Sequence, residues 1–329
     1  MPGRYSYRVY ASCDADQHAE RLEKWNQSYD QLSPGRFDGR LVCCWFGRVQ
    51  LFREITNQSV HESGNPWPGS RTFAVPLAAA DGRGWVKSQM LDSGGAFTLG
   101  PKDELDFCTP RQLDLAGISF EAEALSAFAG VVDGRDVERE LQSQTVLRPS
   151  PECLAAAQAF LRGLFAMLDA SHDMLAYAAV QKGIEQALMT AMLGLFTEPN
   201  EDRPRRSALS YRRVVAAARD YVLAHSFEPV TVPDLCRRVG VSRRTLQTCF
   251  KEVMGVSPVQ YLRALRLNAV RRELRAAQPG CVQVQNIAAR WGFWHLSSFS
   301  ADYKKMFGEK PSQTLSGTCG KFTTAGGVC

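Results

Sequence analysis

The spacing of hydrophobic and polar positions changes along the chain and divides it into parts. Through residues 1–145, short runs rich in Val, Leu, Phe and Trp alternate with clusters of Gly, Pro, Asp and Ser. The runs at 40–46, 49–53, 71–77 and 113–120 are examples. Many short strands separated by turns predict a β structure, either a barrel or a sandwich.

Between Pro149 and Phe196 the apolar spacing becomes helical. Apolar residues recur at steps of three or four in both halves of this stretch, from Leu154 to Leu164 and from Ile184 to Phe196. This period predicts two amphipathic helices that form an antiparallel hairpin. Two roles are open for the hairpin: it covers one face of the β domain, or it forms the seam of a homodimer.

A polar stretch then separates the hairpin from a second helical region. TEPNEDRPRRSA at 197–208 carries two prolines and has the composition of a linker. Helical spacing continues to about residue 315, and the Gly- and Thr-rich end is expected to be disordered. We therefore expect an α+β chain with a β domain at 1–145, the hairpin at 146–198, a linker at 199–208, a helical domain at 209–315 and a tail at 316–329.

The helical domain contains an internal repeat. The segment DLCRRVGVSRRTLQTCFKEVMGVSP, which ends at Pro258, is similar to NIAARWGFWHLSSFSADYKKMFGEKP, which ends at Pro311. Leu235 corresponds to Ile287 and Gly240 to Gly292, each 52 residues later. The second copy then has one extra residue, so Phe250 corresponds to Tyr303, 53 residues later. A repeat of this size identifies one structural unit that occurs twice.

Each copy has the signals of a helix-turn-helix. A short helix ends at a glycine, a turn of three or four residues follows, and a second helix begins with its own cap. In the first copy Thr231 caps the opening helix and Ser242 caps the next. The second helix turns its apolar face inward and leaves a polar face outward, made of Arg243, Arg244, Gln247, Thr248 and Lys251. Such side chains suit base edges and phosphates.

A long amphipathic stretch at 257–277 joins the two copies. At about 1.5 Å per residue it spans roughly 30 Å, close to the ~34 Å between successive major grooves on one face of B-DNA. The stretch is therefore a candidate rigid spacer that presents both second helices to adjacent grooves. Its arginines are available for phosphates or for intramolecular ion pairs: Arg263, Arg266, Arg271, Arg272 and Arg275.

Residues 211–315 resemble the DNA-binding domain of AraC/XylS regulators. The matching residues are LQTCFKEVMGVSPVQYLRALRLNAVRREL, then IAARWGF, SSFS, YKKMFG and KP. The resemblance implies seven helices, contact with two successive major grooves of promoter DNA, and recruitment of RNA polymerase as an activator. In the second unit it implies DNA contacts by Leu296, Ser297, Ser300, Ala301 and Lys304. His295 stands where such domains commonly have a capping Asp or Ser.

The N-terminal half is similar to the cupin-like sensor domains of some AraC-type regulators, including ethanolamine-responsive ones. QLSPGRFDG at 31–39 and GRVQLFRE at 47–54 carry this similarity. It implies an N-terminal cupin-like β-barrel whose interior binds a small-molecule effector. Candidate lining residues are Trp45, Phe52, Phe73, Phe97 and Phe107, and ordinary core packing is the alternative role for each.

Charge supports a nucleic-acid-binding C-terminal part. The whole chain has a net charge of +5, but residues from 201 onward hold 21 Lys and Arg against 9 Asp and Glu. A basic C-terminal part behind a weakly acidic N-terminal part is typical of a sensor joined to a nucleic-acid-binding domain, although a solvated basic face is the plain alternative.

Composition argues against several other functions. The N-terminus has no apolar signal-peptide core, and charges interrupt the apolar runs, so we expect a cytoplasmic protein with no membrane partner. The ten cysteines form no CxxC pair and are expected to be reduced, with thiol sensing as an alternative. The five histidines do not cluster, and no catalytic motif is present, so we expect no enzyme activity, metal or cofactor. A cupin enzyme and a protein-interaction adaptor are the competing hypotheses.

Overall fold

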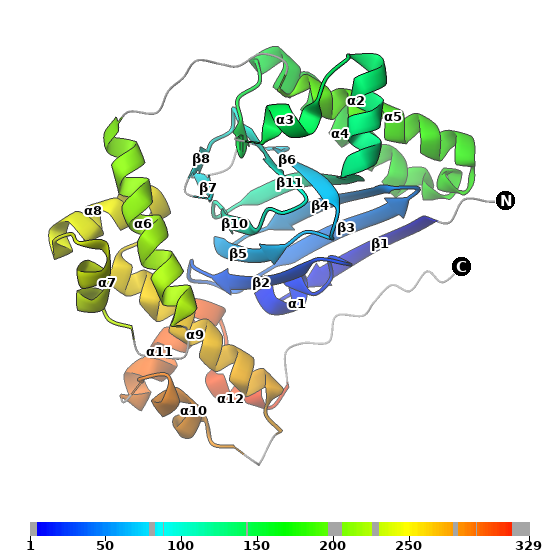
Figure 1. The fold of residues 1–329 in the computed structure, drawn as a ribbon. Helices are drawn as coiled ribbons and strands as arrows, with labels where there is room; N and C mark the ends of the chain where they lie inside the picture. Colours follow the sequence, from blue (N-terminus) through cyan, green and yellow to red (C-terminus); the bar gives the residue numbers. More distant parts are fainter. Residues whose placement is uncertain are drawn as a thin grey trace.

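The computed structural model describes residues 5–78, 83–87, 89–142, 144–196, 206–225, 230–278, 282–293 and 295–317. It shows a β-rich N-terminal part with helices on one side and a helical C-terminal part against the other (Figure 1). The predicted mixture of helix and sheet is confirmed. Most of the predicted linker at 199–208 and of the tail at 316–329 lies outside the described residues.

Two antiparallel sheets form the N-terminal part. The larger has the order β1 (Tyr5–Ser12), β3 (Gly39–Phe46), β4 (Val49–Thr56), β11 (Leu113–Glu121), β6 (Ser70–Pro76), β9 (Ala96–Leu99) and β12 (Val146–Leu147). The smaller has the order β2 (Asn26–Gln31), β5 (Val60–Asn65), β10 (Leu105–Cys108), β7 (Gly84–Val86) and β8 (Gln89–Leu91). Among the described residues no strand pairing joins the two sheets, so the predicted closed barrel is not confirmed and the arrangement is a sandwich.

Alternation along the strands gives the large sheet two different buried faces. In β3, Cys44 and Phe46 belong to the core under the helices, whereas Leu41 and Cys43 belong to a cluster between the sheets. Successive side chains of a strand point to opposite faces, which separates these two sets. Because both faces are buried, β6 is buried at every position and shows no polar alternation.

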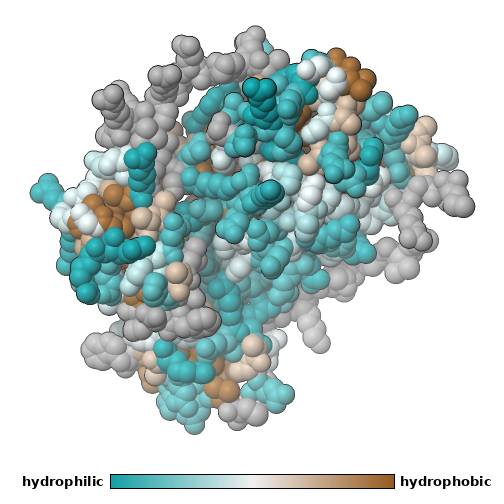
Figure 2. Space-filling model, viewed as in Figure 1, coloured by the Kyte–Doolittle hydropathy of each residue, from teal (hydrophilic) through white to brown (hydrophobic). Residues whose placement is uncertain are grey.

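Helices cover the outer face of the large sheet: α2 (Ala122–Val132), α3 (Val137–Leu141), α4 (Pro151–Ser171), the short η1 (His172–Ala176) and α5 (Ala178–Gly194). Leu161 and Leu188 of the α4–α5 hairpin are fully buried in one core with Val49 and Phe73 of the sheet. The hairpin therefore covers the β domain, and its second role as a dimer seam stays a prediction. The end of α2 carries a hydrophobic surface patch, where Val131 and Val132 are exposed (Figure 2).

Residues 151–176 form a long, largely apolar helical stretch. Among the described residues it is the one stretch that is long and apolar enough to cross a membrane by length and composition alone. Leu154, Leu161 and Leu168 of its inner face pack against the large sheet, as in the core helix of a globular domain.

The C-terminal part consists of seven helices over the described residues from 206 to 317. They are α6 (Arg206–Ala224), α7 (Val232–Val239), α8 (Arg243–Met254), α9 (Pro258–Ala276), α10 (Val284–Arg290), α11 (Leu296–Phe307) and α12 (Pro311–Leu315). Two separate hydrophobic clusters stabilise them. Tyr261 and Leu262 at the start of α9 belong to the first cluster, and Val270 and Leu274 near its end belong to the second. Helix α9 therefore links the two units as the predicted spacer.

Candidate nucleic-acid interface

The first helix-turn-helix is defined by local caps. Thr231 and Asp234 form a capping box at the start of α7, and Gly240 ends that helix with a φ of 67°. This left-handed conformation strains any residue with a Cβ, which explains the glycine at the turn. The Ser242 side chain then accepts a hydrogen bond from the backbone N–H of Thr245 and starts α8. The predicted caps are confirmed.

The second unit repeats this arrangement with different caps: Gln283, at the N-cap of α10, makes no side-chain capping hydrogen bond. Gly292 precedes α11 with a φ of 78°, and Gly308 ends α11 with a φ of 74°. His295 occupies the N-cap position of α11 but makes no side-chain capping hydrogen bond there.

Both second helices turn their predicted contact faces to solvent. All ten predicted side chains are exposed: Arg243, Arg244, Gln247, Thr248 and Lys251 on α8, and Leu296, Ser297, Ser300, Ala301 and Lys304 on α11. The opposite faces are buried, through Phe250 and Val253 in α8 and through Phe299 and Tyr303 in α11. The exposure fits the predicted role, while contact with DNA stays a prediction for each residue.

The arginines of α9 make intramolecular ion pairs. Arg271 Nε lies 2.6 Å from Asp14 Oδ2, and its Nη1 lies 2.8 Å from Glu309 Oε1. Arg275 also pairs with Asp14, and Arg272 pairs at 2.8 Å with carboxylates of the N-terminal part, those of Asp16 and Asp30. Arg263 pairs with Asp302 of α11. Four of the five arginines thus show the intramolecular role, while Arg266 lies over the Phe293 ring at 5.5 Å from its centroid.

Asp14 is the centre of this contact between the two parts of the chain. It precedes α1 (Ala15–Ala19), caps it by accepting from the Gln17 backbone N–H at 3.0 Å, and is 3% exposed. Burial acts to raise the pKa of Asp14, but Arg271 and Arg275 outweigh it and the pKa is lowered. The ionised carboxylate is therefore the stable form beside α9.

Backbone hydrogen bonds add to these ion pairs. The Asn268 amide accepts from the Gln31 backbone N–H at 3.1 Å and donates to the Gln31 carbonyl at 2.9 Å. The Gln31 side chain and the Gly35 N–H both donate to the Met306 carbonyl, at 2.7 and 3.1 Å. The edge strand β2 is thus bound to α9 and α11 through groups that are otherwise costly to bury.

A second contact joins the smaller sheet to the first helix-turn-helix unit. Arg219 of α6 pairs with Asp106 of β10, and its Nη2 lies 2.6 Å from His61 Nε2. Burial and the Arg219 charge lower the pKa of His61 to about 3, so its ring is neutral and accepts from the guanidinium. Cys108 packs on Met254 of α8 with the two sulfurs 3.6 Å apart. The sandwich therefore contacts both units.

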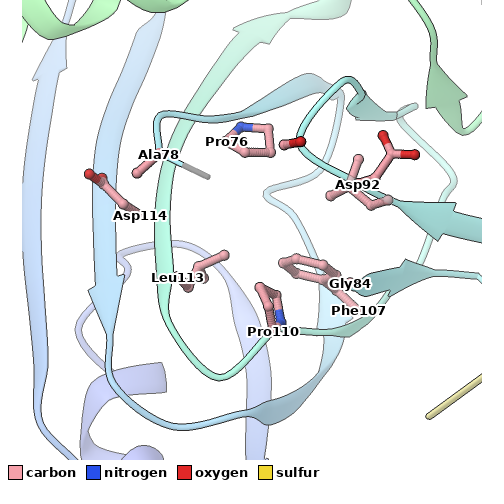
Figure 3. A pocket seen from close by; sticks show the side chains of 10 residues that line it. Pro76, Ala78, Gly84, Asp92, Phe107, Pro110, Leu113 and Asp114 are labelled. Carbon is pink, nitrogen blue, oxygen red and sulfur yellow. The ribbon is translucent and has the colours of Figure 1, made fainter. Parts of the chain in front are cut away.

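The five aromatic residues proposed for an effector pocket are not brought together. Phe97 and Phe107 lie between the sheets with ring centroids 5.1 Å apart. Phe73 lies on the helix side of the large sheet, and Trp45 and Phe52 belong to a third cluster. A cavity of only about 20 Å³, room for about one water molecule, has Phe107 in its wall, beside Pro76, Gly84, Pro110 and Leu113 (Figure 3).

The interior between the sheets also contains buried polar residues that we did not predict. Glu54 of β4 and Glu62 of β5 are 2% and 3% exposed, and the Tyr29 hydroxyl donates to Glu54 at 3.3 Å. Burial raises the pKa of Glu62 well above its usual value, and the nearby Glu54 raises it further. In the sequence, the only signal of these residues is that Gln50 and Glu54 are four residues apart in β4 and so lie on the same face of the strand.

Two of the alternative chemistries can be examined in the structure. Burial raises the pKa of Cys43 and Cys44 to about 12 and also raises that of Cys108, which suppresses the reactive thiolate form that a thiol sensor needs. Within the described ranges no group of three or more His, Cys, Asp or Glu side chains is placed to hold a metal ion.

Two helix-turn-helix units on one connecting helix, each with an exposed second helix, define a nucleic-acid-binding module. A family model described as a helix-turn-helix domain matches residues 235–317. The "Probable thc operon regulatory protein" of Rhodococcus erythropolis is 33% identical over 155 residues, which are 47% of each chain. The "XylDLEGF operon transcriptional activator 2" of Pseudomonas putida is 33% identical over 26% of this chain and 55% of its own.

A solved structure titled as a probable AraC family transcriptional regulator from Rhodopseudomonas palustris is 33% identical over 32% of this chain and 95% of its own, with a TM-score of 0.30. The chain belongs to the AraC/XylS family of transcriptional regulators. It spans about half the length of the two curated relatives. Both curated relatives are named as regulators of operons.

Proposed function

We propose that the protein regulates transcription by binding a specific sequence of double-stranded promoter DNA through α8 and α11. The observation that carries this proposal is the exposure of all ten predicted contact residues on two similar helices whose opposite faces are buried. Arg244 and Gln247 of α8 have the donor groups that read guanine and adenine edges in the major groove. Leu296, which is 42% exposed, suits a thymine methyl group.

The exposed basic residues would bind phosphates. Three of the α9 arginines pair with carboxylates of the N-terminal part, so Arg243, Lys251 and Lys304 are the better candidates for backbone contacts. Binding should therefore weaken steeply as salt increases, because each neutralised phosphate releases counterions.

A role as an activator that recruits RNA polymerase is part of the proposal. The similar Pseudomonas putida protein is named a transcriptional activator, which supports this direction of control. We propose further that a small-molecule effector binds in the N-terminal part. Support comes from the contacts of β2 and β10 with both helix-turn-helix units, because a change in the sandwich then reaches the DNA-binding helices directly.

We also propose that the α4–α5 hairpin forms a homodimer. Its outer face has an open apolar groove lined by Ala159, Phe160, Gly163, Ile184 and Ala187 among others. A Cβ added at Gly163 would meet nothing within 4 Å, so Gly163→Glu should leave the monomer folded while placing a charge in the groove. Sedimentation should show a dimer that this variant dissociates. Gly130→Glu in α2, another glycine with open space, is the matched control.

Selection from a random DNA duplex pool, followed by gel shifts at several salt concentrations, tests the DNA-binding proposal. Arg244→Ala and Gln247→Ala should each weaken binding to the selected sequence by about 10- to 100-fold and relax its specificity. Arg48→Ala, which removes an exposed arginine of the sandwich, should leave binding unchanged. Equal binding to selected and scrambled duplexes would contradict the proposal and favour the adaptor alternative.

A further inference from the structure

At one end of the sandwich an exposed lysine lies over the ring of one tryptophan, beside a second tryptophan. The ammonium nitrogen of Lys24 lies 4.2 Å from the ring centroid of Trp45 and 6.0 Å from that of Trp67. The two indole rings are 5.5 Å apart with an angle of 50° between them. The three side chains come from separate segments: the turn before β2, strand β3, and the turn between β5 and β6. We call this group the tryptophan cage.

Two further features of this group need an explanation. Its backbone has a φ of 66°, a left-handed conformation that costs energy for a residue with a side chain. The Nε1 atoms of Trp45 and Trp67 are buried, and neither has a hydrogen-bond partner. Buried donors without acceptors are rare and need an explanation, and a ligand that supplies an acceptor is one.

The cage is continuous with a polar interior. Trp45 lies opposite Gln50 in the β3–β4 pairing, and Gln50 is fully buried. The Gln50 side chain accepts from the Trp25 indole N–H at 2.9 Å and donates to the carbonyl of Glu23, the residue before Lys24. Four residues further along β4, and on the same face, Glu54 is buried, and its Oε1 atom lies 3.0 Å from His18 Nε2.

We propose that the tryptophan cage is the effector site and that its ligand is a small organic ammonium ion, with Lys24 as the internal occupant that the ligand displaces. Aromatic faces attract cations, and weakly hydrated quaternary ammonium groups bind such cages best. The lysine side chain is exposed to solvent, so it can leave without unfolding the sandwich. This inference rests on the effector control proposed above and is independent of the DNA contacts.

Displacement of Lys24 has a route to the DNA-binding helices. The segment that carries Lys24 connects α1 to β2. On one side of it, Asp14 holds Arg271 of α9, and on the other side the Gln31 backbone holds Asn268 of the same helix. A ligand that moves this segment therefore acts on both attachments of α9 together, and so on the placement of the two units that α9 joins.

Calorimetric titration of the full-length protein with choline tests the proposal, with dimethylbutanol, the uncharged carbon isostere of choline, as the control ligand. We expect saturable binding of choline, weaker binding of tetramethylammonium, which has no oxygen to accept from the indole N–H groups, and no binding of the isostere. Trp67→Leu should weaken choline binding at least about tenfold. Lys24→Gly should strengthen it several-fold, because the variant removes the competing ammonium group and the backbone strain. Lys102→Gly, at an exposed turn lysine, is the matched variant.

Three results would overturn the inference: no saturable binding of either ammonium probe, equal binding of the isostere, or a choline affinity that Lys24→Gly leaves unchanged. Gel shifts with the selected duplex separate this from the proposed function. If the duplex binds and choline has no effect on the shift, the effector inference fails while DNA binding stands. If no duplex binds specifically, the proposed function fails whatever choline does.

Discussion

The carboxylate of Asp14 offers the sharpest test of how the sandwich holds the DNA-binding part. Asp14→Asn removes the charge but keeps an oxygen that can cap α1. Asp14 and Arg271 are 3% and 7% exposed at their side chains, so water does not replace the lost partner. Removing one partner of a buried pair typically costs about 3–5 kcal/mol. We expect Asp14→Asn to cost about 3 kcal/mol, the lower end of this range, because Arg271 still pairs with Glu309 in the variant.

Hydrogen–deuterium exchange along α9 measures this loss where it occurs. A local destabilisation of about 3 kcal/mol should speed exchange in α9 by about 100-fold at pH 7. The lowered pKa of Asp14 determines how its contribution to stability depends on pH. Its contribution is present above the ordinary pKa of 3.8 and is lost as pH falls through the lowered value, so the variant and the original chain should converge in strong acid.

A double-mutant cycle identifies the interaction itself. Asp14→Asn, Arg271→Gln and the double variant should show a coupling energy of about 1–3 kcal/mol. Asp133→Asn, at an exposed carboxylate after α2, controls for the general effect of removing a negative charge. A coupling energy below about 0.5 kcal/mol, or an exchange rate in α9 no faster than in the control, would refute the reasoning.

Three further changes test other parts of the fold. Gly117→Ala should lower the melting temperature, with a loss of about 1–3 kcal/mol, because its Cβ would lie 2.0 Å from the Phe52 ring. Gly240→Ala should cost about 1–2 kcal/mol in denaturant unfolding, since a φ of 67° strains alanine; a neutral effect would show that the turn relaxes. The pKa of His61 is lowered to about 3, so its contribution to stability is present above pH 6.5 and is lost as pH falls. Between pH 7 and pH 5 the free energy of unfolding of the original chain should therefore fall by about 2 kcal/mol more than that of His61→Gln. Equal losses in the two proteins would contradict a neutral buried ring.

The correct predictions concern features that neighbouring residues determine. Capping by Thr231 and Ser242, the left-handed turn at Gly240 and the inward spacing of Phe250 all act within one or two helical turns. The internal repeat shows the same helix-turn-helix pattern a second time, which supports the prediction independently. For this reason the two helix-turn-helix units and the exposure of their contact faces were predictable from the sequence.

The N-terminal part was predictable only in outline. Short runs and turns indicated many strands, but the pairing of β4 with β11 joins residues far apart in the chain. Both faces of the large sheet are buried, so the sequence pattern did not separate Phe73, on the helix side, from Phe97, between the sheets. An aromatic residue in a strand indicates burial, and it does not indicate which of two cores receives it.

The two helix-turn-helix units, the spacer between them and the basic character of that part follow from the residues alone, because periodicity, caps and charge are local properties. Folding of the whole chain sets the rest: the spacer arginines pair with Asp14 and its neighbours, Lys24 lies over the Trp45 ring, and the sheets form a sandwich. Each of these depends on which surfaces meet after the chain folds, and long-range contacts of that kind leave no periodic signal in the residues that make them.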